Sequence, residues 1–132
     1  MDKSWNEKLI KKHISKIKVI EKKFADIPAG SSMYISTPQE IKSEVDKINP
    51  GKTLSQKDLR VKLAKKHKTD YTCPVTTGIY LRIIAEASLE EYRNGKQVTQ
   101  LTPFWRVIEK DSSLWKKLSF SKDEDKVFSI VA

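Results

Sequence analysis

The sequence has few of the residues that support covalent or metal chemistry. Its 132 residues include one cysteine, Cys73, and two histidines, His13 and His67. A single cysteine excludes an internal disulfide and a zinc site built from cysteines. The two histidines lie too far apart in the sequence for the usual spacing of metal ligands. We therefore expect neither a metal nor a cofactor.

Long apolar segments are also absent. The N-terminus is charged throughout, so it lacks the apolar stretch of a signal peptide. No segment is long enough and apolar enough to span a bilayer. Hydrophobic residues make up 38% of the chain and charged residues 33%, which is typical of a soluble globular domain. We therefore expect a cytoplasmic protein, nucleoid-associated if it binds DNA, with no membrane partner.

The chain carries an excess of positive charge, with a formal net charge of +9 at pH 7. A domain this basic commonly binds nucleic acid, and the alternative is that the charge only keeps the protein soluble. Three acids, Glu86, Glu90 and Glu91, lie apart from the most basic segment. This separation favours DNA, because the release of counterions rewards a concentrated basic surface. Between residues 52 and 68 a single acid accompanies seven basic residues, which are Lys52, Lys57, Arg60, Lys62, Lys65, Lys66 and Lys68.

The N-terminal segment resembles an amphipathic helix. Residues 3–24 have apolar side chains at helical spacing, including Ile10, Ile14 and Ile17, with lysines between them. The pattern predicts one long helix whose lysine face is solvated or contacts a partner. The segment IPAGSS at residues 27–32 has the composition of a linker. We therefore divide the chain into a helical extension, residues 1–30, and a main domain, residues 31–132.

Three further helices are predicted in the main domain. Thr37 can cap the first, and Glu40 can close a capping box there. Ser55 can cap the second, which runs to about residue 67. The third covers residues 74–93. Its expected inward residues are Ile79, Tyr80, Ile83, Ile84 and Ala87.

Strand signals flank these helices. Residues 52–54 can form a short strand, and the Asn94-Gly95 turn precedes two candidate strands at residues 97–99 and 104–108. The order of elements is that of a winged helix-turn-helix domain. The predicted fold is therefore mainly α with a small β hairpin and an extra N-terminal helix. In it, the helix that begins at Pro74 is the recognition helix and the hairpin is the wing.

The residues expected to contact DNA lie on two of these helices. The helix over residues 55–67 would cross the phosphate backbone. The start of the next helix offers hydroxyl groups and a positive dipole end. Gly78 permits either the close approach of a nucleotide or the packing of another helix. The predicted DNA-binding residues are Lys52, Gln56, Lys57, Arg60, Lys62, Thr76, Thr77, Gly78 and Arg82.

Three segments together resemble the DNA-binding domain of the 6-O-methylguanine-DNA methyltransferases. Residues 48–59 (INPGKTLSQKDL) resemble its segment "IPxGxVxTYGxIA", and residues 74–78 (PVTTG) resemble the start of its recognition helix. Residues 103–108 (PFWRVI) resemble its active-site motif "PCHRVI". The segments occur in the family's order, and the resemblance spans roughly residues 37–118. It implies a winged-helix core that binds DNA.

The sequence departs from this family where the family performs its chemistry. Phe104 stands at the position of the acceptor cysteine, and Trp105 stands at that of the histidine that relays a proton. Arg106 matches the motif. A phenyl ring cannot accept an alkyl group, so the resemblance implies no methyl transfer at this position.

A branch of this family, the alkyltransferase-like proteins, also lacks the acceptor cysteine. Those proteins bind alkylated guanine in DNA without repairing it, and they recruit other repair proteins. The resemblance therefore implies a non-enzymatic protein that senses alkylated guanine in double-stranded DNA, with DNA-repair proteins as further partners. We expect a monomer. Gln56 replaces the motif's tyrosine, Gly78 stands near the place of the arginine that fills the gap left by a flipped base, and Arg82 lies one turn later.

Phe104, Trp105 and Arg106 form the candidate base pocket. Aromatic rings can stack on an extrahelical base, but an alternating strand would turn one ring inward. We therefore expect only one of the two rings to face an open pocket. Three alternatives remain. They are a plain winged-helix DNA-binding or regulatory protein, a methyltransferase that uses Cys73 with His67 as its base, and a protein-interaction module that uses the N-terminal helix.

Overall fold

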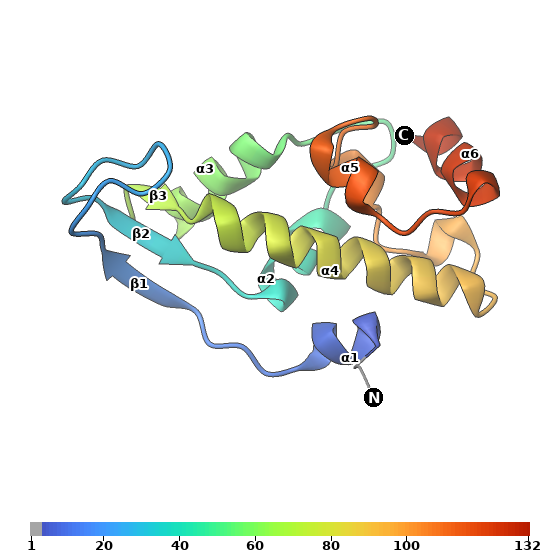
Figure 1. Cartoon of the computed structure of the whole chain (residues 1–132), viewed down its shortest axis with the longest axis horizontal. Coiled ribbons are helices and arrows are strands. Elements are labelled where there is room, and N and C mark those ends of the chain that lie inside the picture. The colour runs from blue at the N-terminus through green and yellow to red at the C-terminus, as the bar shows by residue number, and fades with distance from the viewer. Residues whose placement is uncertain (1–3) are drawn as a thin grey trace.

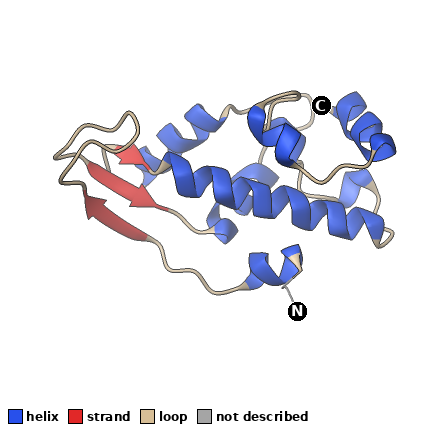
Figure 2. Cartoon of the chain, in the orientation of Figure 1, coloured by secondary structure: helices blue, strands red, loops and turns tan. Residues whose placement is uncertain are grey.

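Helix α4 (Pro74–Arg93) runs along most of the molecule and connects its two ends (Figure 1). All strands gather near the start of α4, whereas the C-terminal helices lie toward its other half (Figure 2). The computed structural model describes residues 4–132. The other elements, in chain order, are α1 (Trp5–Ile10), β1 (Lys16–Val19), β2 (Ser32–Ile35), α2 (Pro38–Asp46), α3 (Gln56–Lys66), β3 (Tyr71–Thr72), η1 (Val98–Gln100), η2 (Phe104–Arg106), α5 (Ser113–Lys117) and α6 (Lys122–Val131).

The sheet has three strands in the order β1-β2-β3. Strand β1 pairs antiparallel with β2, so that Lys16 lies opposite Ile35. Strand β2 pairs in parallel with β3, and α2 and α3 form the crossover between these two strands. Asp70 ties β3 to β2, because its carboxylate accepts a hydrogen bond from the Ser32 N–H at 2.9 Å. The sheet therefore closes residues 32–72 into one unit, and α4 follows directly.

The predicted N-terminal helix is wrong beyond its first turns. Only Trp5–Ile10 is helical, Lys16–Val19 is strand β1, and Lys3 lies outside the described residues. Lysines alternate with β-branched residues in β1, and that period of two suits a strand. Helix α1 packs against α4 and β1 pairs with β2, so residues 4–30 contribute to the same body as residues 31–132.

The three helices predicted for the main domain are confirmed. The Thr37 hydroxyl accepts the Glu40 N–H at 3.2 Å at the start of α2. The Ser55 hydroxyl accepts the Asp58 N–H at 3.0 Å at the start of α3. Helix α4 begins at Pro74, where a missing N–H costs no helical hydrogen bond. The chain is therefore mainly helical with a small sheet, as predicted.

The predicted wing is wrong, because neither residues 97–99 nor residues 104–108 form a strand, and the 3-10 turns η1 and η2 lie there instead. The Asn94 N–H donates to Glu90 O at 3.0 Å, and Gly95 has a φ of +107°. The pair Asn94-Gly95 therefore ends α4 as a helix cap instead of turning a hairpin. Residues 52–54 are not a strand either, although the Leu54 N–H donates to Arg106 O at 2.8 Å.

The main core joins the buried side of α4 to a cluster of aromatic rings, and a smaller core of Ile20, Ile27, Met33 and Cys73 lies at the sheet. Leu81, Ile84 and Leu89 of α4 are buried against α2 and α3, whereas Ile79, expected inside, is 52% exposed. The ring of Phe104 is fully buried and its centroid lies 5.3 Å from that of Phe128 in α6. The aromatic cluster is made of Phe104, Trp105, Trp115, Phe120 and Phe128.

Candidate nucleic-acid interface

The basic side chains of α3 fall into two groups, and the first group binds acids of α2. The Lys62 ammonium lies 3.0 Å from a Glu44 oxygen. Lys66 lies 3.6 Å from both Glu40 and Glu44. The Glu44 carboxylate is nearly buried, and the nearby lysines hold its pKa below the ordinary value although burial opposes this. Lys62, predicted to contact DNA, is therefore occupied within the fold.

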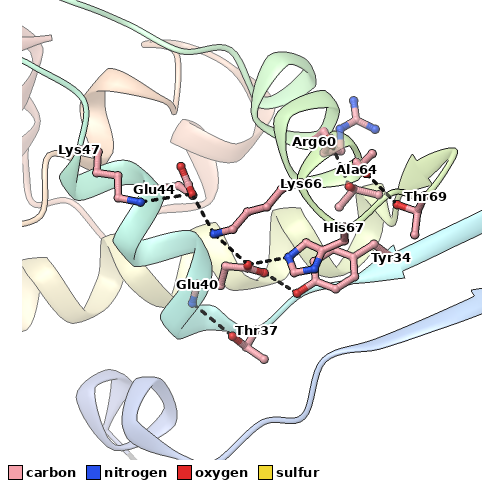
Figure 3. A network of polar contacts seen from close by, with 11 residues as sticks. Tyr34, Thr37, Glu40, Glu44, Lys47, Arg60, Ala64, Lys66, His67 and Thr69 are labelled. Carbon is pink, nitrogen blue, oxygen red and sulfur yellow. Dashed lines mark hydrogen bonds and ion pairs between the residues drawn. The ribbon is translucent and has the colours of Figure 1, made fainter.

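A polar network continues from these ion pairs to the sheet (Figure 3). The Tyr34 hydroxyl donates to one Glu40 oxygen at 2.5 Å, and His67 Nε2 lies 2.8 Å from the other. Burial would raise the pKa of Glu40, but hydrogen bonds from Tyr34 and His67 outweigh it and lower the pKa. Burial and the bond to Glu40 raise the pKa of Tyr34 to about 12. The predicted capping box is therefore absent, because the Glu40 side chain serves this network.

The second group of basic side chains lies on α3 and in the segments just before and after it, and forms no ion pair with these acids. Within residues 4–132, no carboxylate lies within 4.0 Å of their nitrogens. Figure 3 shows the Arg60 guanidinium directed away from Glu40 and Glu44. A cleft of about 260 Å³ beside Lys57 and Arg60 is also lined by two acids, Asp26 and Asp70. The group, called here the free basic group, consists of Lys52, Lys57, Arg60, Lys65 and Lys68.

The start of α4 offers fewer polar groups than the sequence predicts. The Thr77 hydroxyl is buried and donates to Cys73 O at 2.7 Å. Thr76 is half-buried, and Gly78 has no atom within 4 Å of the position of an added Cβ. Packing of another helix therefore does not explain Gly78, and the space beside it is open. The exposed side chains here include Val75, at 51%, which is apolar.

Two further residues that the sequence predicted to bind DNA, Arg82 and Gln56, are partly covered by neighbouring parts of the fold. The Arg82 guanidinium lies 3.9 Å from the buried Glu86 and over the ring of Trp5, 5.4 Å from its centroid. Arg82 is therefore held against α1 and its own helix. Gln56 is the half-buried first residue of α3, next to the exposed Lys57 of the free basic group.

Acids in the second half of α4 hold neighbouring elements in place. Glu86 accepts hydrogen bonds from the Ser119 N–H at 3.0 Å and the Ser119 hydroxyl at 2.6 Å. Glu90 accepts the Trp5 and Asn6 N–H groups, both at 2.9 Å, at the start of α1. Burial opposes ionisation of Glu90, but these hydrogen bonds lower its pKa. Both carboxylates bind groups inside the protein, so they do not neutralise the positive charges of the free basic group.

Both rings of the candidate base pocket are buried in the same core cluster, with their centroids 5.1 Å apart. Trp105 differs in that it also lines a cavity of about 410 Å³, together with Arg106 and the residues that lead into α3. Trp105 is 7% exposed. Arg106 lies over its ring at 6.0 Å and donates to Ile48 O at 2.7 Å. A cavity of this size is in the range of small-molecule sites.

Cys73 is placed poorly for a nucleophile. Its side chain is 3% exposed at the junction between β3 and α4. Its N–H donates to Tyr34 O at 2.9 Å, so the local backbone belongs to the sheet. His67, the base suggested for Cys73, holds Glu40 through Nε2. A reactive cysteine normally lies in a partly exposed, electropositive environment.

The comparisons with family models, with curated proteins and with solved structures found no match to this chain. The resemblance to the methyltransferases therefore depends on the three quoted motifs. In residues 4–132, no group of three or more histidine, cysteine or acidic side chains is arranged to hold a metal ion. None of the helices in this part of the chain is both long and apolar enough to cross a membrane.

Proposed function

We propose that this protein binds double-stranded DNA without catalysing a reaction, through the free basic group on and around α3. One observation carries the proposal. Five basic side chains have no acidic partner among the described residues, while Glu40, Glu44, Glu86 and Glu90 are held in internal bonds. Such a surface releases counterions when it contacts phosphates.

Helices α3 and α4 would act as a helix-turn-helix pair, with α3 on the phosphates and the start of α4 toward the groove. The connection over residues 67–73 contains strand β3, which makes it longer than the usual turn of three or four residues. Val75 and Ile79 are the large side chains exposed near the start of α4. They offer no hydrogen bonds to base edges, so we expect little sequence preference.

Fluorescence polarisation with an unmodified duplex tests the proposal. If four or five phosphates are contacted, log Kobs should fall against log salt with a slope of about −4. Reversing two charges in the variant K57E/R60E should weaken binding and reduce the slope by about 2. The matched control K116E/K117E makes the same charge change on exposed residues of α5 and should change the slope little.

Two outcomes would refute DNA binding through α3. One is the absence of binding at low salt. The other is an equal loss in the two charge-reversed variants, which would show that net charge alone attracts DNA. Circular dichroism of both variants separates a loss of binding from a loss of fold.

A second function is favoured by the cavity beside Trp105. Because Trp105 and Arg106 line a cavity of about 410 Å³, an extrahelical base would enter beside Arg106, with the 7% of Trp105 that is exposed left for contact. The proposal follows the resemblance to alkyltransferase-like proteins, with alkylated guanine as the ligand and repair proteins as further partners. A duplex with one 6-O-methylguanine should then bind more tightly than the unmodified duplex. Equal affinity would refute lesion recognition and would support DNA binding without a base pocket. The mass of the protein should stay unchanged, and a methyl adduct on Cys73 would contradict a non-enzymatic role.

A further inference from the structure

Strand β1 is an edge of the sheet that no described element covers. Its pairing with β2 uses one side, and β3 lies on the far side of β2. All four residues of β1 are exposed. Ile17 is 57% exposed and Val19 is 62% exposed. Exposed β-branched residues on an edge strand are a common template for another strand.

The backbone of β1 presents free hydrogen-bonding groups on this edge. The Ile20 N–H donates to Ser31 O at 3.0 Å, and Ile20 and Ser31 continue the register in which Val19 lies opposite Ser32. Because bonded and non-bonded pairs alternate in antiparallel strands, Ile17 and Val19 direct their N–H and C=O groups outward.

The two faces of β1 differ in chemistry. Lys16 and Lys18 lie on one face, beside a groove of about 630 Å³ that is lined by Lys22, Lys23 and a single acid, Glu21, and also by Val19, Met33, Cys73 and Val75. Ile17 points to the opposite face, because side chains alternate along a strand. An added strand would therefore place every second side chain near the lysines and the others near Ile17 and Val19.

We propose that β1 is a docking edge for an extended segment of a partner protein in which acidic and apolar residues alternate. The acidic side chains pair with Lys16 and Lys18, the apolar ones pack on Ile17 and Val19, and the backbone adds a fourth strand. A second copy of this chain fits the edge poorly, because two β1 strands would bring their lysines together. This site is separate from the free basic group and does not depend on DNA binding.

The probe is a labelled, end-blocked peptide, Val-Glu-Val-Glu-Val-Glu-Val, titrated with the full chain by fluorescence polarisation. The variant K16E/K18E should weaken its binding at least about tenfold, because like charges then face each other. The variant I17S/V19S keeps the charge of the chain and should also weaken peptide binding, while its affinity for duplex DNA stays unchanged. N-methylation of alternate peptide amides should abolish binding, because the backbone bonds are lost.

Three results would overturn the proposal. The first is no binding of the alternating peptide to a folded chain. The second is equal binding of the N-methylated peptide, which lacks the backbone donors, or of a peptide with its glutamates in one block, which lacks the alternating pattern, since both keep the charge. The third is a concentration-dependent dimer that I17S/V19S disrupts, which would make a second copy the occupant of the edge.

Discussion

The rings of Tyr34 and His67 stack with their centroids 3.8 Å apart, and each side chain binds a different oxygen of Glu40 (Figure 3). Tyr34 belongs to β2, Glu40 to α2, and His67 caps the end of α3. One carboxylate therefore joins β2 and α2, which are neighbours in the sequence, to the end of α3, which lies 27 residues beyond Glu40. The same contact fixes which side of α3 meets α2, and so which basic residues stay free.

Removal of this carboxylate should cost stability. The variant E40A leaves Tyr34 and His67 without their shared partner, and we expect it to lower the free energy of unfolding by about 2 kcal/mol. Urea denaturation measures the change. The matched control D46A removes an acid of the same helix whose ion pair with Lys42 is about 40% exposed, and it should cost less than about 0.5 kcal/mol. Equal losses would show that the network is not specially stabilising.

The hydroxyl of Tyr34 should titrate late. Its pKa is raised from 10.0 to about 12 by burial and by the bond to Glu40. The folded protein holds this proton to a higher pH than the unfolded chain. The contribution of the Tyr34 hydroxyl to the free energy of unfolding is therefore fully present below pH 10 and is lost as the pH rises toward 12. Tyrosinate absorbance should show a step near pH 12 that Y34F lacks, and an identical titration of both proteins would contradict this.

Glu124 should make the C-terminal region sensitive to acid. The hydrogen bonds from Arg93, at 2.8 Å to each carboxylate oxygen, are the main cause that lowers the pKa of Glu124 from 4.5 to about 2. The folded pKa is depressed, so this stability is present above pH 4.5 and is lost as the pH falls toward 2. Unfolding of the wild type should become easier across this interval, whereas E124Q should change less. Parallel curves for the two proteins would refute the assignment.

Glu90 should control the attachment of α1. Its carboxylate accepts the first N–H groups of α1, so E90A leaves them without a partner. We expect amide hydrogen exchange in α1 to accelerate about tenfold or more, because charged hydrogen bonds of this kind contribute about 1.5–3 kcal/mol. The control E91A removes only the ion pair with Lys96 at 3.1 Å. Faster exchange throughout the chain would indicate global destabilisation instead of local release.

Local signals in the sequence were sufficient to predict where a helix starts when the signalling residue acts on the backbone of that same helix. Thr37, Ser55 and Pro74 mark the starts of α2, α3 and α4 because each serves the backbone within three residues. Ser4 does the same at α1, where its hydroxyl accepts the Glu7 N–H. The helix predicted over the rest of the N-terminal segment is wrong because the apolar residues there fit both a helical spacing and the alternation of a strand. Pairing with β2 selects the strand.

The partners of polar side chains could not be predicted, because they depend on which elements meet. Seven basic residues between positions 52 and 68 carry the same sequence signal, yet Lys62 and Lys66 bind acids of α2 and Lys57 does not. Likewise, Asn94-Gly95 suits both a hairpin and a helix end, and the length of α4 made it the latter. The burial of both Phe104 and Trp105 also depends on such a meeting of elements, because Phe128 of α6 packs against both rings.

The position of Cys73 gives this protein a built-in probe. It is the single thiol of the chain, and it is buried where β3 passes into α4. The thiol is 3% exposed and lines the groove beside Lys16 and Lys18, so the rate of its reaction with a thiol-blocking reagent reports how accessible that groove and the β3–α4 junction are. Each reacted molecule gains one adduct, which makes the count unambiguous by mass. The accessibility of the junction between β3 and α4 can thus be followed in the wild-type protein, with DNA or peptide present or absent.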